Sequence, residues 1–305
     1  NNMKSILITG GTGLIGKKLI SKLKKKHYNI YVLTRKGSYT EDDVNYLEWD
    51  PENYKLDIKG INNLFSIIHL AGESINGSRW TKSYKKKILD SRIDTTKLLF
   101  KTIKKLKLKP KSFISASATG YYRADTNLTQ KESDPQGTGF LSGVVKKWED
   151  EVLRFNNINV NTTVLRIGLV LSKEGGILKS LYPIFKLCLG VTVGTGKQMM
   201  SWIHEEDMIN IIIKGLEDNK FKGIYNCVAP EKVSNQKFTI ALAKTLGRFR
   251  YPKFFKVPSF VIRLLFGGQS VLILNGLNVS SKKIIKSNFK FKYSKLLPAL
   301  RSLYN

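Results

Sequence analysis

Short, continuously apolar stretches alternate with longer amphipathic ones along most of the chain. The apolar stretches lie at 5–9, 29–35, 45–50, 66–72, 111–117, 163–171 and 223–229. Strands that are buried on both faces show continuous apolar runs of this kind, and helices between them favour parallel pairing. The pattern therefore predicts an α/β fold with a doubly wound parallel sheet of the Rossmann type.

The stretches between the predicted strands have helical periodicity. In 14–26, the side chains of Ile15, Leu19, Ile20 and Leu23 fall on one face. Further helices are predicted at 79–107 and 140–156, and at 233–247, where Ser234 is the expected N-cap and Gly247 follows the end.

The alternation weakens after Ser172, which indicates a second structural unit. We expect residues 1–180 to form a nucleotide-binding domain, joined again by 205–230. Residues 181–204 and 231–305 are expected to form a smaller, mostly helical C-terminal lobe that binds substrate.

The segment ITGGTGLIG (8–16) follows a predicted strand and opens a predicted helix. Gly10 allows a tight turn, Gly13 lets the backbone approach a pyrophosphate, and Gly16 lets the helix pack closely on the sheet. The backbone amides of Leu14, Ile15 and Gly16 would then face the phosphates at the helix N-terminus. The strand–turn–helix context predicts a dinucleotide site.

The end of the second predicted strand distinguishes two dinucleotides. An acidic residue there binds the ribose 2′-hydroxyl of NAD, whereas this chain has Arg35 and Lys36 after Thr34. Cations suit a 2′-phosphate, so we expect NADP, with NAD as the less favoured alternative.

The net charge of +29 is unusual, and it arises from 52 basic against 23 acidic residues. The basic runs lie within helical patterns and lack interleaved aromatic residues. We therefore expect solvated lysine-rich faces, and nucleic-acid binding remains a disfavoured alternative.

The cysteines and the lengths of the apolar runs indicate where in the cell the protein is expected. Cys188 and Cys227 have neither disulfide nor metal-site spacing, and no metal is expected. No apolar run reaches the roughly 18 residues of a membrane span. We expect a cytoplasmic location, or an organelle such as a plastid if a transit peptide has been removed.

Several motifs together resemble one atypical branch of the extended short-chain dehydrogenase/reductases, the epimerase-family (sugar-nucleotide-epimerase-like) proteins. These motifs are TGGTGLIG (9–16), HLAGES (69–74), SRIDTTKLL (91–99), SATGYY (117–122), FLSGVVKKWE (140–149) and GTGKQMMSWIHEEDM (194–208). The end of the chain resembles that branch's C-terminal domain of unknown function.

The resemblance implies roles by position. Leu70, Ala71 and Gly72 would line the adenosine and ribose side of the cofactor, and Ser117 matches the active-site Ser or Thr beside the nicotinamide. The larger family has a Tyr and, four residues later, a Lys on the next helix, and here Leu141 and Val145 stand in their places. An aliphatic pair cannot exchange a proton or bind a ribose hydroxyl.

Other residues are candidates for the missing chemistry, each with a structural alternative. Tyr121, Tyr122 and His204 are candidate acid/base groups beside Ser117, whereas stacking in the pocket is the alternative for the tyrosines and helix capping is the alternative for His204. Substrate-contact candidates are Glu73, Arg92, Arg166 and Trp202, of which Arg92 could instead pair with Asp90 or Asp94, and Trp202 could serve packing alone. His69, inside an apolar strand, is expected to be a core histidine.

Two functions follow from these features. The first is an NADP(H)-dependent oxidoreductase or epimerase that acts on a small polar molecule without the usual Tyr-x-x-x-Lys pair. The alternative is a non-catalytic, cofactor-binding regulator with a protein partner, for example in cell or plastid division.

Overall fold

The computed structural model describes residues 3–124, 128–188, 190–248 and 256–304. Its main element is a nine-stranded sheet with the order β13-β8-β7-β6-β1-β2-β4-β3, and β5 pairs with β4. All pairs from β13 to β4 are parallel, while β3 and β5 are antiparallel to β4. The predicted Rossmann-type α/β fold is therefore present.

The strands of this sheet are short and, in the centre, almost entirely buried. They are β1 (Ser5–Thr9), β2 (Asn29–Thr34), β3 (Tyr39–Glu41), β4 (Val44–Asp50), β5 (Lys55–Leu56), β6 (Leu64–His69), β7 (Ser112–Ala118), β8 (Asn161–Ile167) and β13 (Gly223–Cys227).

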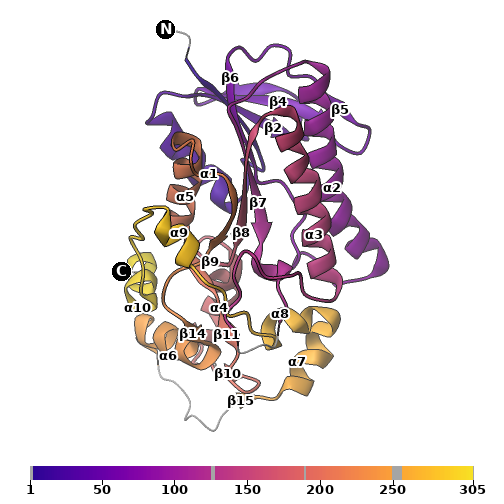
Figure 1. Ribbon diagram of the computed structural model, residues 1–305. Coiled ribbons are helices and arrows are strands. Elements are labelled where there is room, and N and C mark those ends of the chain that lie inside the picture. Colours follow the sequence, from indigo (N-terminus) through magenta and orange to yellow (C-terminus); the bar gives the residue numbers. More distant parts are fainter. Residues whose placement is uncertain (1–2, 125–127, 189, 249–255, 305) are drawn as a thin grey trace.

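Helices cover both faces of the sheet (Figure 1). Helices α1 (Leu14–Lys24) and α5 (Glu205–Glu217) bury isoleucines and leucines on one face, with Ile8, Ile68 and Ile114 from the strands. Helices α2 (Lys82–Lys105) and α3 (Phe140–Leu153) cover the other face and pack with Leu7, Ile67 and Phe113. Burial on both faces explains why the strands lack apolar–polar alternation.

A smaller lobe lies beyond the carboxyl ends of the central strands (Figure 1). Its core joins Leu171, Leu178, Phe185, Trp202, Phe238 and Leu300. Its elements are β9 (Leu169–Leu171), α4 (Gly176–Lys186), β10 (Thr192–Val193), β11 (Met199–Met200), β12 (Trp202–His204), β14 (Val233–Ser234), α6 (Asn235–Thr245), β15 (Lys256–Val257), α7 (Ser259–Phe266), α8 (Val271–Leu274), α9 (Lys282–Lys286) and α10 (Leu296–Tyr304). Ser234 caps α6 as predicted, because its hydroxyl accepts from the Lys237 amide.

The predicted single strand at 163–171 is wrong in one respect. It breaks at Gly168, after which β9 leaves the main sheet and pairs with β12. A side chain at Gly168 would lie 2.5 Å from the Ser201 carbonyl oxygen, so this close crossing requires glycine.

The C-terminal segment also reaches back to the large sheet. Helix α9 packs on the edge strand β13, and the Lys283 ammonium donates to the Ile224 carbonyl at 2.7 Å. The Lys292 and Tyr293 amides donate to the Asp207 carboxylate on α5. Across the described residues, no helix is long and apolar enough to cross a membrane.

Candidate functional site

The glycine loop connects β1 to α1 at the carboxyl edge of the sheet. Gly10 has φ of +69°, and a Cβ there would lie 2.7 Å from the Leu70 carbonyl carbon. A Cβ on Gly16 would lie 2.4 Å from the Gly10 carbonyl oxygen. Gly13 is exposed and meets only that same oxygen. The loop therefore excludes side chains inward and leaves its outer backbone open to a ligand.

The start of α1 has the features of an anion-binding helix terminus. Its N-cap, Gly13, offers no side-chain acceptor, and the first turn contains no acidic residue. The amides of Leu14, Ile15 and Gly16 thus have no hydrogen-bond partner within the described residues. Three free amides and the positive end of the helix dipole suit a pyrophosphate.

A buried hydrogen-bond chain fixes this loop against β6. The Thr9 hydroxyl accepts from the Leu70 and Ala71 amides, both at 3.1 Å, and donates to Nδ1 of His69 at 2.7 Å. Nε2 of His69 then donates to the Thr96 hydroxyl at 3.0 Å. Burial, and secondarily the charge of Arg92, lowers the pKa of His69 to about 3. His69 is therefore a neutral core histidine, as the sequence predicts.

The cations predicted to select the cofactor follow β2 directly. Arg35 and Lys36 are exposed, and the Lys36 amide is held by the Thr34 hydroxyl at 3.2 Å. Because β2 lies next to β1, both cations lie at the same sheet edge as the glycine loop.

The loop after β6 contacts Arg92 of α2. Leu70 and Ala71 are half-buried, and Gly72 is exposed. A Cβ added to Gly72 would lie 3.2 Å from Cζ of Arg92. Nη1 of Arg92 donates to the carbonyls of Glu73 and Ile88. Arg92 thus holds this loop rather than an aspartate of its own helix, and burial lowers its pKa to about 10.

The Glu73 carboxylate forms an ion pair with a lysine of α2. The exposed Lys87 ammonium lies 3.3 Å from it, and the Glu73 side chain is itself partly exposed. A partly exposed carboxylate next to Gly72 remains a candidate acceptor for a polar ligand.

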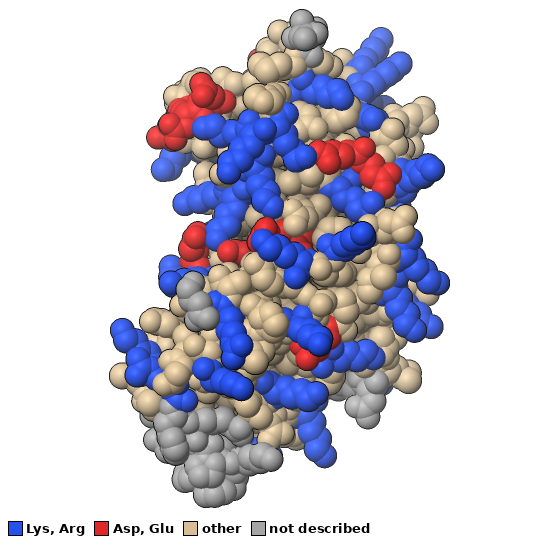
Figure 2. All heavy atoms as spheres, turned by 90° about the vertical axis from the view of Figure 1, so that its left-hand side faces the viewer, with Lys and Arg blue, Asp and Glu red and all other residues tan. Residues whose placement is uncertain are grey.

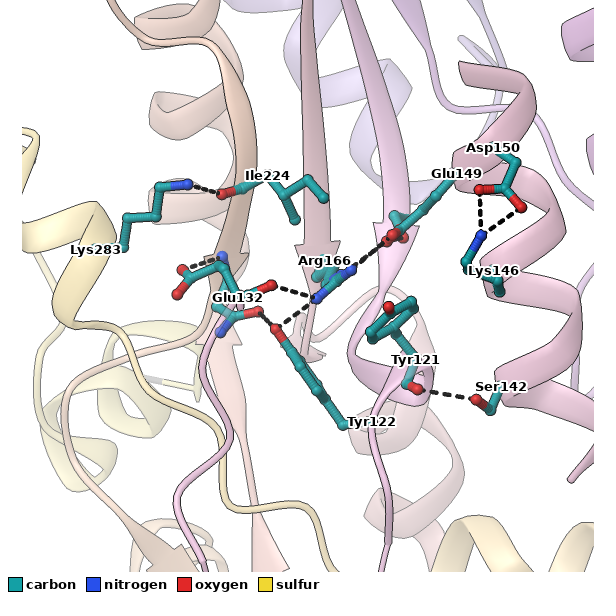
Figure 3. Close-up of polar contacts among 12 residues, drawn as sticks. Tyr121, Tyr122, Glu132, Ser142, Lys146, Glu149, Asp150, Arg166, Ile224 and Lys283 are labelled. Carbon is teal, nitrogen blue, oxygen red and sulfur yellow. Dashed lines mark hydrogen bonds and ion pairs between the residues drawn. The ribbon is translucent and has the colours of Figure 1, made fainter. Parts of the chain in front are cut away.

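Ser117, Arg166 and Asn226 are neighbours in register on β7, β8 and β13. Ser117 donates to Oε1 of Glu149 at 2.6 Å. Glu149 on α3 also accepts two bonds from Arg166, at 2.8 and 2.7 Å (Figure 3). Arg166 and Glu149 are almost completely buried. Burial alone would lower the pKa of Arg166, but its bonds to Glu149 raise it overall.

The network continues through Tyr122. Its hydroxyl accepts from Nη1 of Arg166 at 2.8 Å and donates to Asn226 at 2.6 Å. The backbone N–H of Asn226 donates to the Glu132 carboxylate at 2.9 Å. Burial raises the pKa of Tyr122 to about 12. These contacts favour a structural role for Tyr122.

Tyr121 differs from its neighbour. Its ring lies over the Arg166 guanidinium, 3.4 Å from Cζ to the ring centroid, and its hydroxyl has no partner among the described residues (Figure 3). Ser142 on α3 holds the Tyr121 carbonyl at 2.9 Å. Tyr121 is therefore the tyrosine whose proton is not already committed.

Arg166 is not available as a substrate clamp in this arrangement. All three guanidinium nitrogens donate to Glu149, to Tyr122 or to the Glu132 carbonyl. The predicted substrate contact of Arg166 overlooked one constraint: an arginine inside an apolar strand is buried and therefore needs a buried partner.

Helix α3 carries the aliphatic pair where the larger family has Tyr and Lys. Leu141 is half-buried, and Val145 packs in a cluster with Tyr121, Tyr122 and Val228. Lys146, the next residue, pairs with Asp150, four residues further along α3 (Figure 3). It does not replace the absent lysine.

His204 and Trp202 lie in β12, in the smaller lobe. His204 caps α5 by accepting from the Glu206 amide at 3.1 Å, and its Nε2 contacts the Ser302 hydroxyl. Burial lowers the pKa of His204 to about 4. Trp202 is fully buried and donates to the Glu231 carbonyl. The structure thus favours the capping and packing alternatives for these two residues over contact with a ligand.

The surface charge is spread widely. Figure 2 shows Lys and Arg side chains over the whole face formed by α1, α5 and the C-terminal helices, with few acidic groups between them. Several of these lysines pair across elements, as Lys18 does with Glu205 at 2.6 Å. Among the described residues, no group of three or more His, Cys, Asp or Glu side chains could hold a metal ion.

Residues that the sequence interpretation missed complete the site. Glu149, Glu132 and Asn226 build the buried network, and Thr9 connects the glycine loop to β6. One signal was available: Glu149 shares the apolar face of its helix with Val145, Trp148 and Val152, where an acid needs a cation.

The class defined by this geometry is a Rossmann-type dinucleotide fold with a smaller lobe at the carboxyl edge. Residues 6–227 match the model of the NAD dependent epimerase/dehydratase family, and residues 257–303 match a domain of unknown function, DUF1731. The chain belongs to the NAD dependent epimerase/dehydratase family. The resemblance to epimerase-family proteins with a C-terminal domain of unknown function is thereby confirmed.

Two relatives match this chain over almost its full length. The epimerase family protein SSP1921 of Staphylococcus saprophyticus is 36% identical over 303 residues, covering 99% of both chains. Human epimerase family protein SDR39U1 (isoform 2), solved with NADPH, superposes with a TM-score of 0.88 at 30% identity, covering 98% of this chain and 99% of that one.

A nucleoside-diphosphate sugar epimerase from Corynebacterium glutamicum superposes with a TM-score of 0.79 at 25% identity. The superposition covers 99% of this chain and 58% of the Corynebacterium chain. The Staphylococcus proteins are bacterial and give no support for a plastid location.

Proposed function

We propose that this protein binds NADP(H) and acts as an oxidoreductase or epimerase on a small polar substrate. The observation that carries the proposal is the open glycine loop with three free amides, next to Arg35 and Lys36 at the end of β2. A cationic side chain at that position suits a 2′-phosphate. The human relative that was solved with NADPH supports the same preference.

The pocket residues fit such a cofactor. Gly10, Gly13 and Gly16, with the amides of Leu14 and Ile15, would hold the pyrophosphate. Leu70, Ala71 and Gly72 would line the adenosine and ribose side of the cofactor, and Ser117 lies one strand further along. The cofactor supplies hydride chemistry, so the protein must orient it and provide one acid/base group.

Tyr121 is the acid/base group that the geometry favours. Its hydroxyl is uncommitted, while the hydroxyls of Ser117 and Tyr122 both donate within the buried network. Arg92 and Glu73, at the loop after β6, remain the proposed contacts for a polar substrate. The proposed location is cytoplasmic.

Titration calorimetry tests the cofactor assignment directly. We expect the protein to bind NADPH more tightly than NADH. If neither dinucleotide binds, the proposal is wrong. A panel of carbonyl compounds and nucleotide sugars, assayed with both cofactors, then tests for turnover, and Tyr121→Phe should abolish any activity found while NADPH still binds.

A non-catalytic regulator is the second candidate. The observation that favours it is the apolar packing of Val145 and the half-buried Leu141 at the place of the missing Tyr and Lys. This function predicts NADPH binding without consumption of NADPH across the whole panel. A single substrate turned over at a rate above background would exclude it.

A further inference from the structure

The hydroxyl proton of Ser117 is already committed. Its oxygen lies 2.6 Å from Oε1 of Glu149, and both groups are buried. Both oxygens of Glu149 act as acceptors, because Oε1 accepts from Nε and Oε2 from Nη2 of Arg166. Ser117 must therefore be the donor, and its oxygen has only lone pairs left for a ligand.

The fold places Ser117 next to one end of the proposed cofactor. The chain reverses its direction of strand addition between β1 and β6, and dinucleotides lie across such a switch point. Arg35 and Lys36 assign the adenosine half to the β2 side. The nicotinamide half then lies over β6 and β7, where Ser117 is the penultimate residue of β7.

We infer that Ser117 accepts a hydrogen bond from the carboxamide N–H₂ of the nicotinamide, and that Glu149 and Arg166 are positioning residues that keep Ser117 in this orientation. The carboxamide is the one hydrogen-bond donor on the nicotinamide ring, and it complements an oxygen that can only accept. The inference rests on the proposed NADP(H) binding.

This orientation changes the role of the serine. A serine that donates to a substrate carbonyl needs its proton free, and here that proton points to Glu149. Ser117 would instead fix the plane of the carboxamide and hence the rotation of the nicotinamide ring. Proton exchange with a substrate would then fall to another group, in agreement with the free Tyr121 hydroxyl.

A cofactor analogue separates this interaction from general binding. In reduced 3-acetylpyridine adenine dinucleotide phosphate, a methyl group replaces the carboxamide N–H₂. The native protein should bind NADPH about three- to tenfold more tightly than this analogue, which is the size of one hydrogen bond. Ser117→Ala should remove that preference by weakening NADPH binding while leaving the analogue's affinity unchanged.

Equal weakening of both ligands in Ser117→Ala, or no change in either, would overturn the inference. If the native protein binds neither ligand, the proposed function itself fails, so the two failures are distinguishable.

The positioning role of Glu149 needs a double-mutant cycle. Glu149→Gln should also lose the preference for NADPH over the analogue, and adding Ser117→Ala should cause no further loss, because both changes act through one oxygen. Additive losses would show that Glu149 acts elsewhere, and an unchanged preference in Glu149→Gln would exclude its positioning role.

Buried Arg166 can destabilise Glu149→Gln, so two further variants keep the test decisive. Glu149→Leu with Arg166→Met removes both charges together and should likewise lose the preference. Glu151 lies on the same helix, and its carboxylate pairs with Arg154. The Glu151→Gln variant should keep the preference for NADPH.

Discussion

The two halves of the sheet's carboxyl edge are built on opposite principles. Over β1, β2 and β6 the edge consists of glycines, free amides and exposed cations. Over β7, β8 and β13 it is filled by a buried ion pair and its hydrogen-bond partners. The first half is open until a ligand supplies the missing partners, whereas the second is satisfied without one. The residues proposed to hold the cofactor phosphates are therefore separate from those whose buried contacts stabilise the fold.

The largest effect is expected at the open half. In Gly16→Ala, the new Cβ would lie 2.4 Å from the Gly10 carbonyl oxygen, so the loop must move. We expect NADPH affinity to fall by about 100-fold or more, equivalent to about 3 kcal/mol. Calorimetry measures it. Gly37→Ala is the matched control, since nothing lies within 4 Å of a Cβ there and affinity should not change.

Breaking the filled half should unfold the protein more readily. Glu149→Gln leaves Arg166 without its buried counter-charge and should lower the free energy of unfolding by about 3 kcal/mol. Urea denaturation measures this loss. Glu149→Leu with Arg166→Met should recover most of it. Glu151, whose partly exposed carboxylate pairs with Arg154, provides the control. If Glu149→Gln lowers the free energy of unfolding no more than Glu151→Gln does, the burial argument is wrong.

The pH dependence of stability tests a buried histidine in each part of the molecule. His69 lies in β6 of the open half, and His204 lies in β12 of the smaller lobe. The pKa values of His69 and His204, about 3 and about 4, lie below the ordinary value of 6.5. At each of these two histidines the unfolded chain binds more protons. The stability that they contribute is full above pH 6.5 and is lost as the pH falls toward the folded-state pKa. Each histidine contributes about 1.4 kcal/mol per pH unit between 6.5 and its folded-state pKa.

Thermal denaturation from pH 7 to 4.5 checks this slope. In His204→Asn, the asparagine still caps α5 but cannot titrate, so the slope should decrease by about half. An unchanged slope would show that His204 is already protonated in the folded protein.

The smallest effect concerns the choice between dinucleotides. Arg35→Ala removes a cation from an exposed position, where screening limits its contribution. NADPH affinity should fall by about three- to tenfold, about 1 kcal/mol, while NADH affinity stays the same. Measuring both at low and high salt tests the charge assignment, because the difference should shrink at high salt.

The open half could be predicted from the sequence because its signals are local. Gly10, Gly13 and Gly16 are spaced within a single turn, and Arg35 follows directly after a strand. The apolar runs likewise predicted the central strands, since burial on both faces leaves a composition signal in each strand. The short edge strands β3 and β5 have no such signal, and they were not predicted.

The filled half could not be predicted because its contacts are distant in sequence. Glu149 meets Ser117 across 32 residues, and Tyr122 meets Asn226 across 104. These contacts depend on the register of β7, β8 and β13, which the apolar pattern does not specify. A buried Arg166 predicts that a partner exists but does not identify it.

The packing of α9 on β13 has a consequence for synthesis. Strand β13 forms one edge of the main sheet, and an uncovered edge can pair with another chain. The helix that shields it, Lys282–Lys286, is encoded much later in the sequence. A nascent chain on the ribosome therefore exposes this edge until that helix has been translated, and an exposed edge favours aggregation during that interval.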